Sequence, residues 1–318
     1  MKKIDFSLID QTVNHLRQRP GLVIKSSHQA WQEDKWTRKY FGQRPQLGYF
    51  FWLKRSQTKP LASCISLATT GMKQRLVNLV VLEPGVKLEI QAVCQALKPK
   101  LAGQHQTRSQ LVLKKNSFLK FKHQHFWGRE EIVPVKTDFW LEDNSRLDYF
   151  YRNLTSPQRL RMENNFWLKE KAKTSSKIVL EAERNRVELK ERLFLQGQAS
   201  VGSLKLRLVG RQAARLKALS EITAEKESRG HLDCQGLLID DKTVISLAPR
   251  LVNQSQQALL THEASIGRIE QQKLEYLATR GLEEKEAISL LIQGFLETDH
   301  GGKVFFRQAP LDKQTGLA

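Results

Sequence analysis

Three cysteines, Cys64, Cys94 and Cys234, are the first candidates for metal or redox chemistry in this chain. None has another cysteine close by in the sequence, so the chain offers neither a disulfide framework nor a CxxC zinc knuckle. The sparse count suits a reducing compartment. Metal chemistry would therefore need single cysteines that folding brings beside histidine or carboxylate, or ligands from a second chain.

A histidine pair, His123 and His125, lies just before Trp127. Histidines two apart on a strand point the same way, as metal ligands can. This pair and Cys94 are second-rank ligand candidates, because two exposed imidazoles are more often inert. We expect Cys64 to be structural.

The segment Gly301-Gly302-Lys303 looks like part of a phosphate loop. A Walker A motif would need glycine where Glu297 stands and Ser or Thr where Val304 stands. We therefore expect no ATPase activity in this chain, and any nucleotide energy would come from a partner.

The elements that position these residues follow a repeat. Apolar triplets recur and end at Leu82, Leu113, Leu141, Leu168, Leu195 and Ile239. The gaps between these ends are 31, 28, 27, 27 and 44 residues, and the last leaves room for about one and a half units. Units that bury their apolar face only by stacking on neighbours form a solenoid, and the two-residue alternation favours strands. The prediction is a mainly β fold, a parallel β-helix.

An aromatic stripe follows from the same repeat, because Trp140 and Trp167 hold equivalent places in consecutive units. Such a stripe can bind carbohydrate, although stacked rings are more often structural. A sugar-cleaving β-helix would need carboxylates clustered at matching positions, and no such set recurs.

The 318 residues carry 52 Lys+Arg and 33 Asp+Glu, a formal net charge of +19. Residues 221–300 hold eight basic and fourteen acidic residues, which leaves +25 on the remaining 238. A basic body could bind a polyanion or nucleic acid, which is the alternative function. The simpler explanation is a solvated outer sheet face. No apolar run reaches the length of a membrane span and no signal peptide is evident, so we expect a cytoplasmic protein.

The two ends differ from the repeat. Residues 1–75 begin with an amphipathic pattern and are expected to form a helical and mixed segment before a β-helix core over 76–255. Residues 256–318 are expected to form a C-terminal helical segment, with one helical pattern that includes Ile266 and Ile269 and a second through Ala287 and Phe295. Gly281 suits the residue that ends the first helix. Acidic residues at the start of the second helix suit its dipole.

Several separated blocks of this chain resemble the SufB/SufD family of iron–sulfur cluster assembly proteins. The block from Thr261 through His262, Glu263 and Arg268 is similar to the family's C-terminal signature, and it continues through Leu274-Glu275-Tyr276-Leu277, Arg280-Gly281-Leu282, Glu286-Ala287 and Gly294-Phe295. The segment Gly230–Leu238 is similar to the family's cysteine-bearing final rung. The resemblance covers roughly residues 76–297.

The resemblance implies a right-handed parallel β-helix flanked by helices, which acts as a non-catalytic scaffold for a transient iron–sulfur cluster. It implies cluster ligands at Cys234, His262 and Glu263, and positive neighbours such as Arg229 and His231 would lower the pKa of the thiol. It also implies a SufC-type ABC ATPase partner, a second SufB/SufD-type subunit in a homodimer or heterodimer, and a sulfur donor. The residues expected to contact the ATPase lie in the C-terminal hairpin: Ile269, Leu274, Tyr276, Leu277, Arg280, Gly281, Leu282, Glu286, Ala287, Leu291 and Phe295.

Overall fold

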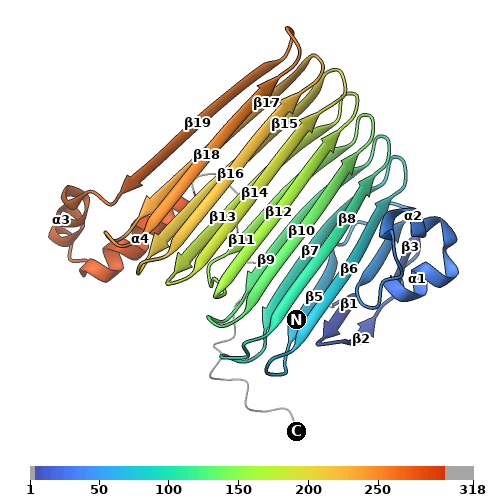
Figure 1. Ribbon diagram of the computed structural model, residues 1–318, viewed down its shortest axis with the longest axis horizontal. Helices are drawn as coiled ribbons and strands as arrows, with labels where there is room; N and C mark the ends of the chain where they lie inside the picture. Colours follow the sequence, from blue (N-terminus) through green and yellow to red (C-terminus); the bar gives the residue numbers. More distant parts are fainter. Residues whose placement is uncertain (1–3, 298–318) are drawn as a thin grey trace.

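A computed structural model describes residues 4–297, most of which form two long sheets that face one another in a β-solenoid (Figure 1). Among the described residues, the larger sheet has ten strands. In spatial order they are β19 (Leu259–Arg268), β17 (Ser228–Leu238), β15 (Ser200–Arg211), β13 (Lys173–Glu183), β11 (Arg146–Asn153), β9 (Phe118–Phe126), β7 (Lys87–Ala96), β5 (Leu61–Leu67), β1 (Phe6–Ile9) and β2 (Thr12–Leu16).

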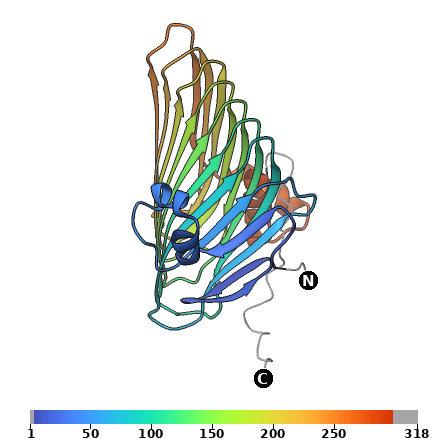
Figure 2. The same cartoon turned by 90° about the vertical axis from the view of Figure 1, so that its right-hand side faces the viewer.

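The second sheet has nine strands in the same part of the chain. Its spatial order is β18 (Val244–Asn253), β16 (Arg215–Ala224), β14 (Arg186–Leu195), β12 (Arg159–Leu168), β10 (Ile132–Leu141), β8 (Gln104–Leu113), β6 (Lys73–Leu82), β4 (Tyr49–Leu53) and β3 (Leu22–Ser26). From β4 to β19 successive strands alternate between the sheets, so each coil contributes one strand to each (Figure 2). The predicted β-helix is confirmed.

The register confirms the sequence repeat. Leu82, Leu113, Leu141, Leu168 and Leu195 follow one another along the second sheet. The next position in that row is Ala224, at the end of β16, whereas Ile239 follows β17 in the opposite sheet. The long final gap therefore holds one full coil and one crossing between sheets.

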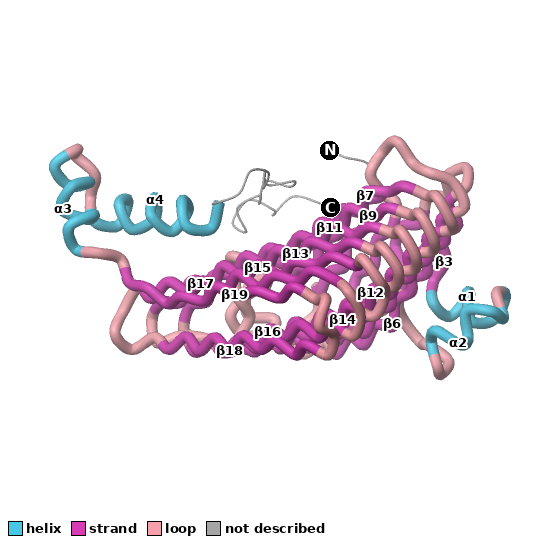
Figure 3. Tube along the Cα trace, turned by 90° about the horizontal axis from the view of Figure 1, so that it is seen from above, coloured by secondary structure: helices cyan, strands magenta, loops and turns pink. Residues whose placement is uncertain are grey.

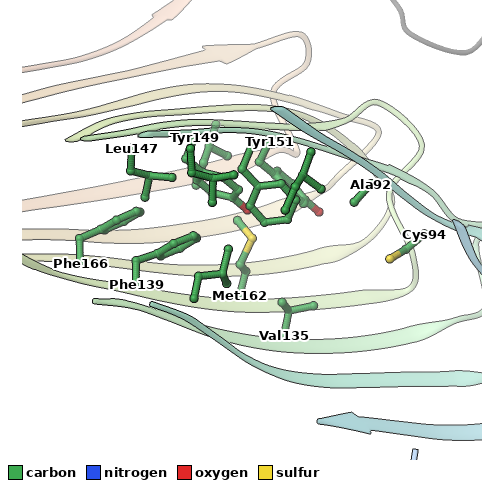
Figure 4. Packing of buried hydrophobic residues seen from close by; sticks show 14 of the residues in the cluster. Ala92, Cys94, Val135, Phe139, Leu147, Tyr149, Tyr151, Met162 and Phe166 are labelled. Carbon is green, nitrogen blue, oxygen red and sulfur yellow. The ribbon is translucent and has the colours of Figure 1, made fainter. Parts of the chain in front are cut away.

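The core fills the space between the sheets, because every second residue of each strand points inward. Phe139 and Phe166 stack there with ring centroids 4.7 Å apart, and Tyr151 is fully buried nearby (Figure 4). On the outside, Trp140 stacks on Trp167 at 5.0 Å, as their equivalent places in the repeat predict.

The N-terminal segment contains less helix than its amphipathic start indicates. The first apolar positions form the antiparallel hairpin β1–β2, not a helix, and strands β3 to β5 already belong to the two sheets. The helices here are α1 (Ser27–Glu33), the 3-10 turn η1 (Lys35–Thr37) and α2 (Arg38–Phe41). Ala30 and Phe41 pack on the outer face of the second sheet, against Phe50 and Leu79.

The C-terminal helices are α3 (Gln271–Thr279) and α4 (Glu284–Glu297), which lie at the opposite end of the molecule from α1 and α2 (Figure 1). Gly281 adopts φ +86 between them, as predicted. The helical prediction for residues 256–318 is wrong at its start, because Leu259–Arg268 form the strand β19. None of the helices in residues 4–297 is long and apolar enough to span a membrane. The Gly301-Gly302-Lys303 segment lies outside the described residues.

Candidate functional site

The last coil of the solenoid, β18 and β19, forms an open end. Both strands are the outermost members of their sheets, and β19 has no buried residue. Three large apolar side chains are exposed there: Val244 at 47%, Leu259 at 61% and Ile266 at 44%. An exposed edge strand with apolar side chains is a template for pairing with another chain.

Cys234 lies one strand inside this open end, on β17. Its side chain points into the core and is 1% exposed. The thiol lies 3.5 Å from the Ser220 hydroxyl of the facing sheet. On the last coil the residue in register with Cys234 is Ala264, so one small side chain separates the thiol's row from the open end.

His262 and Glu263 lie on β19 and point to opposite faces, because adjacent strand residues alternate. His262 pairs in register with Leu232, so it shares the inward face with Cys234. Glu263 pairs with Asp233 on the outer face. Both predicted ligands are exposed. One strand step and two residues place the Cα atoms of Cys234 and His262 roughly 8 Å apart. The chain alone therefore brings the imidazole toward the thiol but leaves the carboxylate on the other side of the strand.

The expected lowering of the Cys234 pKa is wrong. Burial raises the pKa of this thiol, and the negative charges of Asp233 and Glu191 add to the effect. The positive charge that lowers this pKa is that of Arg207, and neither Arg229 nor His231 is among its causes. The outward neighbour that does form a strong pair is Asp233, whose carboxylate accepts two hydrogen bonds from the Arg207 guanidinium at 2.7 and 2.8 Å.

A second cluster of metal-ligating groups lies deep in the solenoid and comprises Cys94 on β7 with His123 and His125 on β9. We call it the internal cluster. Cys94 and His125 are register partners, and the Cys94 Sγ is 3.4 Å from His123 Nε2. Within the described residues, this is the one group of three His, Cys, Asp or Glu residues whose ligand atoms all lie within 4.8 Å of one another. Cys234, His262 and Glu263 do not form such a group.

Comparisons with known proteins decide the family. Residues 66–295 match the family described as "SUF system FeS cluster assembly, SufBD core domain". This chain belongs to the SufBD family.

Relatives agree with that assignment. An iron–sulfur cluster assembly SufBD family protein of Archaeoglobus fulgidus is 27% identical over 301 residues, which cover 89% of this chain and 81% of the relative. A protein of the same description from Methanothermobacter thermautotrophicus strain Delta H is 26% identical over 261 residues. That match covers 80% of this chain and 63% of the relative, so the chain spans less than two thirds of that relative's length.

The C-terminal hairpin of this SufBD chain packs partly on its own solenoid. Along α4, Ile292 and Leu296 are buried against Val179 and Val209 on the outer face of the larger sheet. Figure 3 shows α4 alongside the strands of this sheet. Three of the predicted ATPase contacts also face inward: Ala287 is buried, and Phe295 and Ile269 pack against the same apolar cluster.

The opposite side of the hairpin is open. Tyr276 is 58% exposed and Leu290 49% exposed, and Arg280 stacks over the Tyr276 ring. Leu274, Leu277, Leu282 and Leu291 are half-buried, whereas Gly281 and Glu286 are exposed. Of the predicted ATPase contacts, Tyr276, Arg280, Gly281 and Glu286 are therefore the exposed ones.

Sequence reasoning did not anticipate several polar residues around these sites. Glu191 is fully buried on β14, where its carboxyl accepts hydrogen bonds from the Asn164 amide at 2.6 Å and the Ser176 hydroxyl at 3.2 Å. Its pKa is raised to about 8, mainly by burial. The available signal was position: Glu191 alternates in phase with inward apolar residues of its own strand.

Proposed function

We propose that this chain is a scaffold subunit that holds a nascent iron–sulfur cluster at its open end, where a second SufB/SufD-type subunit, either another copy or a paralogue, completes the site. The membership of the SufBD family supports the chemistry. The observation that supports the position of the cluster site is the uncovered last coil, with Cys234 buried one strand beneath it. The scaffold itself catalyses no reaction in this proposal.

The donor chemistry suits cargo that must leave again. Iron in clusters prefers thiolate, and imidazole or carboxylate are weaker ligands. One thiol and one inward imidazole from this chain form an incomplete ligand set, so ligands from the pairing subunit would finish it. Because burial raises the pKa of the Cys234 thiol, iron must displace its proton. Pairing of the exposed β19 edge would bury Leu259 and Ile266, which favours association.

Cluster loading tests the ligand assignment. The chain is purified with its SufC-type ATPase, reconstituted anaerobically with iron and sulfide, and compared with Cys234→Ala and the matched control Cys64→Ala. We expect Cys64→Ala to load like the parent chain and Cys234→Ala to lose at least about tenfold in bound iron and sulfide. Equal loading of the two variants would remove Cys234 from the site.

We further propose that the exposed side of the hairpin binds the SufC-type ATPase, whose hydrolysis cycle would move the hairpins of paired subunits. The observation that supports this proposal is the exposure of Tyr276, a large aromatic side chain that is more than half exposed beside Arg280. Exposed aromatic and arginine side chains are typical anchors of protein interfaces.

Co-purification tests this assignment. Tyr276→Ala is compared with Trp140→Ala, which removes an exposed aromatic ring from the solenoid instead. We expect Tyr276→Ala to weaken binding of the ATPase by about tenfold or more, as for an interface anchor. Binding that survives deletion of residues 271–297 would refute the hairpin as the docking element.

We propose that the chain acts in the cytosol. A separate sulfur donor would supply the sulfide of the cluster. All three cysteines of the chain are free thiols, which suits a reducing environment.

A further inference from the structure

The internal cluster is placed by the solenoid itself, independently of the open end. Cys94 and His125 face each other across β7 and β9, and His123 lies two residues before His125 on the same inward face. The Nε2 atoms of His123 and His125 are 3.0 Å apart, and Cys94 Sγ is 3.4 Å from the first of them. Cys94 and His125 are 4% and 1% exposed.

These separations are close to those that one bound ion would impose. A tetrahedral ion with bonds of about 2.05 Å to nitrogen and 2.3 Å to sulfur holds two nitrogens about 3.3 Å apart and a nitrogen and a sulfur about 3.6 Å apart. These two separations would thus need to widen by only a few tenths of an ångström, and the third pair, Cys94 and His125, has its donor atoms within 4.8 Å of one another. A cavity of about 20 Å³ borders Cys94 and His123, which is room for one water-sized guest.

A neighbouring hydroxyl orients the His125 imidazole as a ligand. The Tyr151 hydroxyl lies 2.8 Å from His125 Nδ1. A phenol oxygen that accepts the Nδ1 proton leaves the Nε2 lone pair free, and second-shell partners of this kind orient most ligating histidines.

We propose that Cys94, His123 and His125 bind a single thiophilic d10 ion, Cu⁺ or Zn²⁺, inside the solenoid. The ion forms one bond to sulfur and one to each Nε2, and the thiol proton leaves to solvent. Soft thiolate with imidazole selects ions of this class over Mg²⁺ or Ca²⁺, which prefer oxygen. This site is separate from the proposed cluster site at Cys234.

Charge and ligand number distinguish the two ions. One thiolate neutralises Cu⁺, so three donors leave a buried site without net charge. Zn²⁺ keeps one positive charge and usually takes four ligands. His105, on the facing sheet, lies outside the group of donor atoms that are all within 4.8 Å of one another, and its ring centroid is 6.4 Å from that of His125. Its buried Nε2 has no hydrogen-bond partner in the described part of the chain, so this ring would supply the fourth ligand after moving toward the ion.

Metal titration tests the proposal on the full chain. The protein is refolded anaerobically with Zn²⁺, with Cu⁺ held in a competing chelator, or with Co²⁺ as a spectroscopic probe. We expect one ion per chain by mass spectrometry and a thiolate-to-cobalt charge-transfer band. His105→Phe should weaken binding of Zn²⁺ and leave that of Cu⁺ unchanged.

Variants assign the ligands. Cys94→Ser and His123→Phe should each lower affinity at least about tenfold, whereas Cys64→Ala and Cys234→Ala should bind like the parent chain. His123→Phe retains a ring that can stack on Phe121, so it keeps the test informative if Cys94→Ser fails to fold. A folded parent chain that binds none of the three ions, or ligand variants that bind as well as the parent, would overturn the site. Failure of cluster loading at Cys234 would leave these results unaffected.

Discussion

The two buried cysteines of the solenoid interior differ in what covers them. Cys94 lies several coils from the open end, between strands that are paired on both sides. Cys234 has the same low exposure but only one strand, β19, beyond it. In a solenoid each coil is held by its neighbours, so an end coil has half the stabilising contacts of an interior one. Equal burial therefore conceals unequal access, which suits a permanent ion at Cys94 and removable cargo at Cys234.

The largest expected effect is a difference in the free energy of unfolding between a variant in the middle coils and a variant in the last coil. Phe166→Ala removes a fully buried ring that stacks on Phe139, so the free energy of unfolding should fall by about 3–5 kcal/mol. Ile266→Ala, on the exposed β19, should cost less than about 1 kcal/mol. Denaturant titration of both variants checks this, and comparable losses would mean that the last coil is as tightly held as the middle.

Glu191 adds a pH dependence to the middle coils. Its folded-state pKa of about 8 lies above the ordinary 4.5, so the folded chain keeps a proton that the unfolded chain loses. The contribution of Glu191 to the free energy of unfolding should therefore be largest below about pH 4.5. It should decline toward pH 8, with a limiting slope of about 1.4 kcal/mol per pH unit. Glu191→Gln should remove that decline. Glu188→Gln, on the outer face of the same strand, is the control and should leave it in place.

Thiol labelling in the native state measures the difference in access directly. Variants that retain only Cys94 or only Cys234 are treated with a thiol reagent after metal removal. Local opening of the last coil exposes Cys234, whereas Cys94 requires interior coils to separate. We expect Cys234 to react at least about 100-fold faster, which corresponds to about 2.7 kcal/mol. Similar rates would show that the two cysteines become accessible through the same opening.

The sequence predicted the repeat well because stacking imposes it. Identical spacing places residues in register, and the 31-residue gap from Cys94 to His125 equals that from Leu82 to Leu113. The repeat spacing therefore contains enough information to place Cys94 beside His125. The two-residue spacing of His123 and His125 by itself predicts only that these two side chains share a face. The helical prediction failed for residues 261–268 because the apolar positions of so short a segment fit a helix as well as a strand. This strand ends the solenoid, so no further coil covers it.

The electrostatics of Cys234 could not be predicted from its neighbours in the sequence alone. The adjacent Asp233 contributes to the raised pKa of the thiol, but burial is the largest cause, and Glu191 and Ser220 act from the facing sheet. Their influence depends on the distance between the sheets and on burial, neither of which a linear pattern contains.

The smallest expected effect tests whether Glu191 couples the middle coils to the open end. Above about pH 8 the Glu191 carboxylate is charged, and its charge contributes to the raised pKa of Cys234. In Glu191→Gln the thiolate should form more readily, so labelling of Cys234 at pH 9 should accelerate roughly two- to fivefold, the equivalent of about 0.4–1 kcal/mol. At pH 6 Glu191 is already protonated, and the variant and parent should react alike.

Glu188→Gln serves again as the matched control, because it removes an outward carboxylate from β14 that faces away from the core. A rise in Cys234 labelling that is equal at pH 6 and pH 9 would indicate a looser last coil in Glu191→Gln instead of a lost charge. An effect confined to high pH would mean that a proton on Glu191 sets how easily the thiol at the open end ionises, and hence how readily iron replaces its proton.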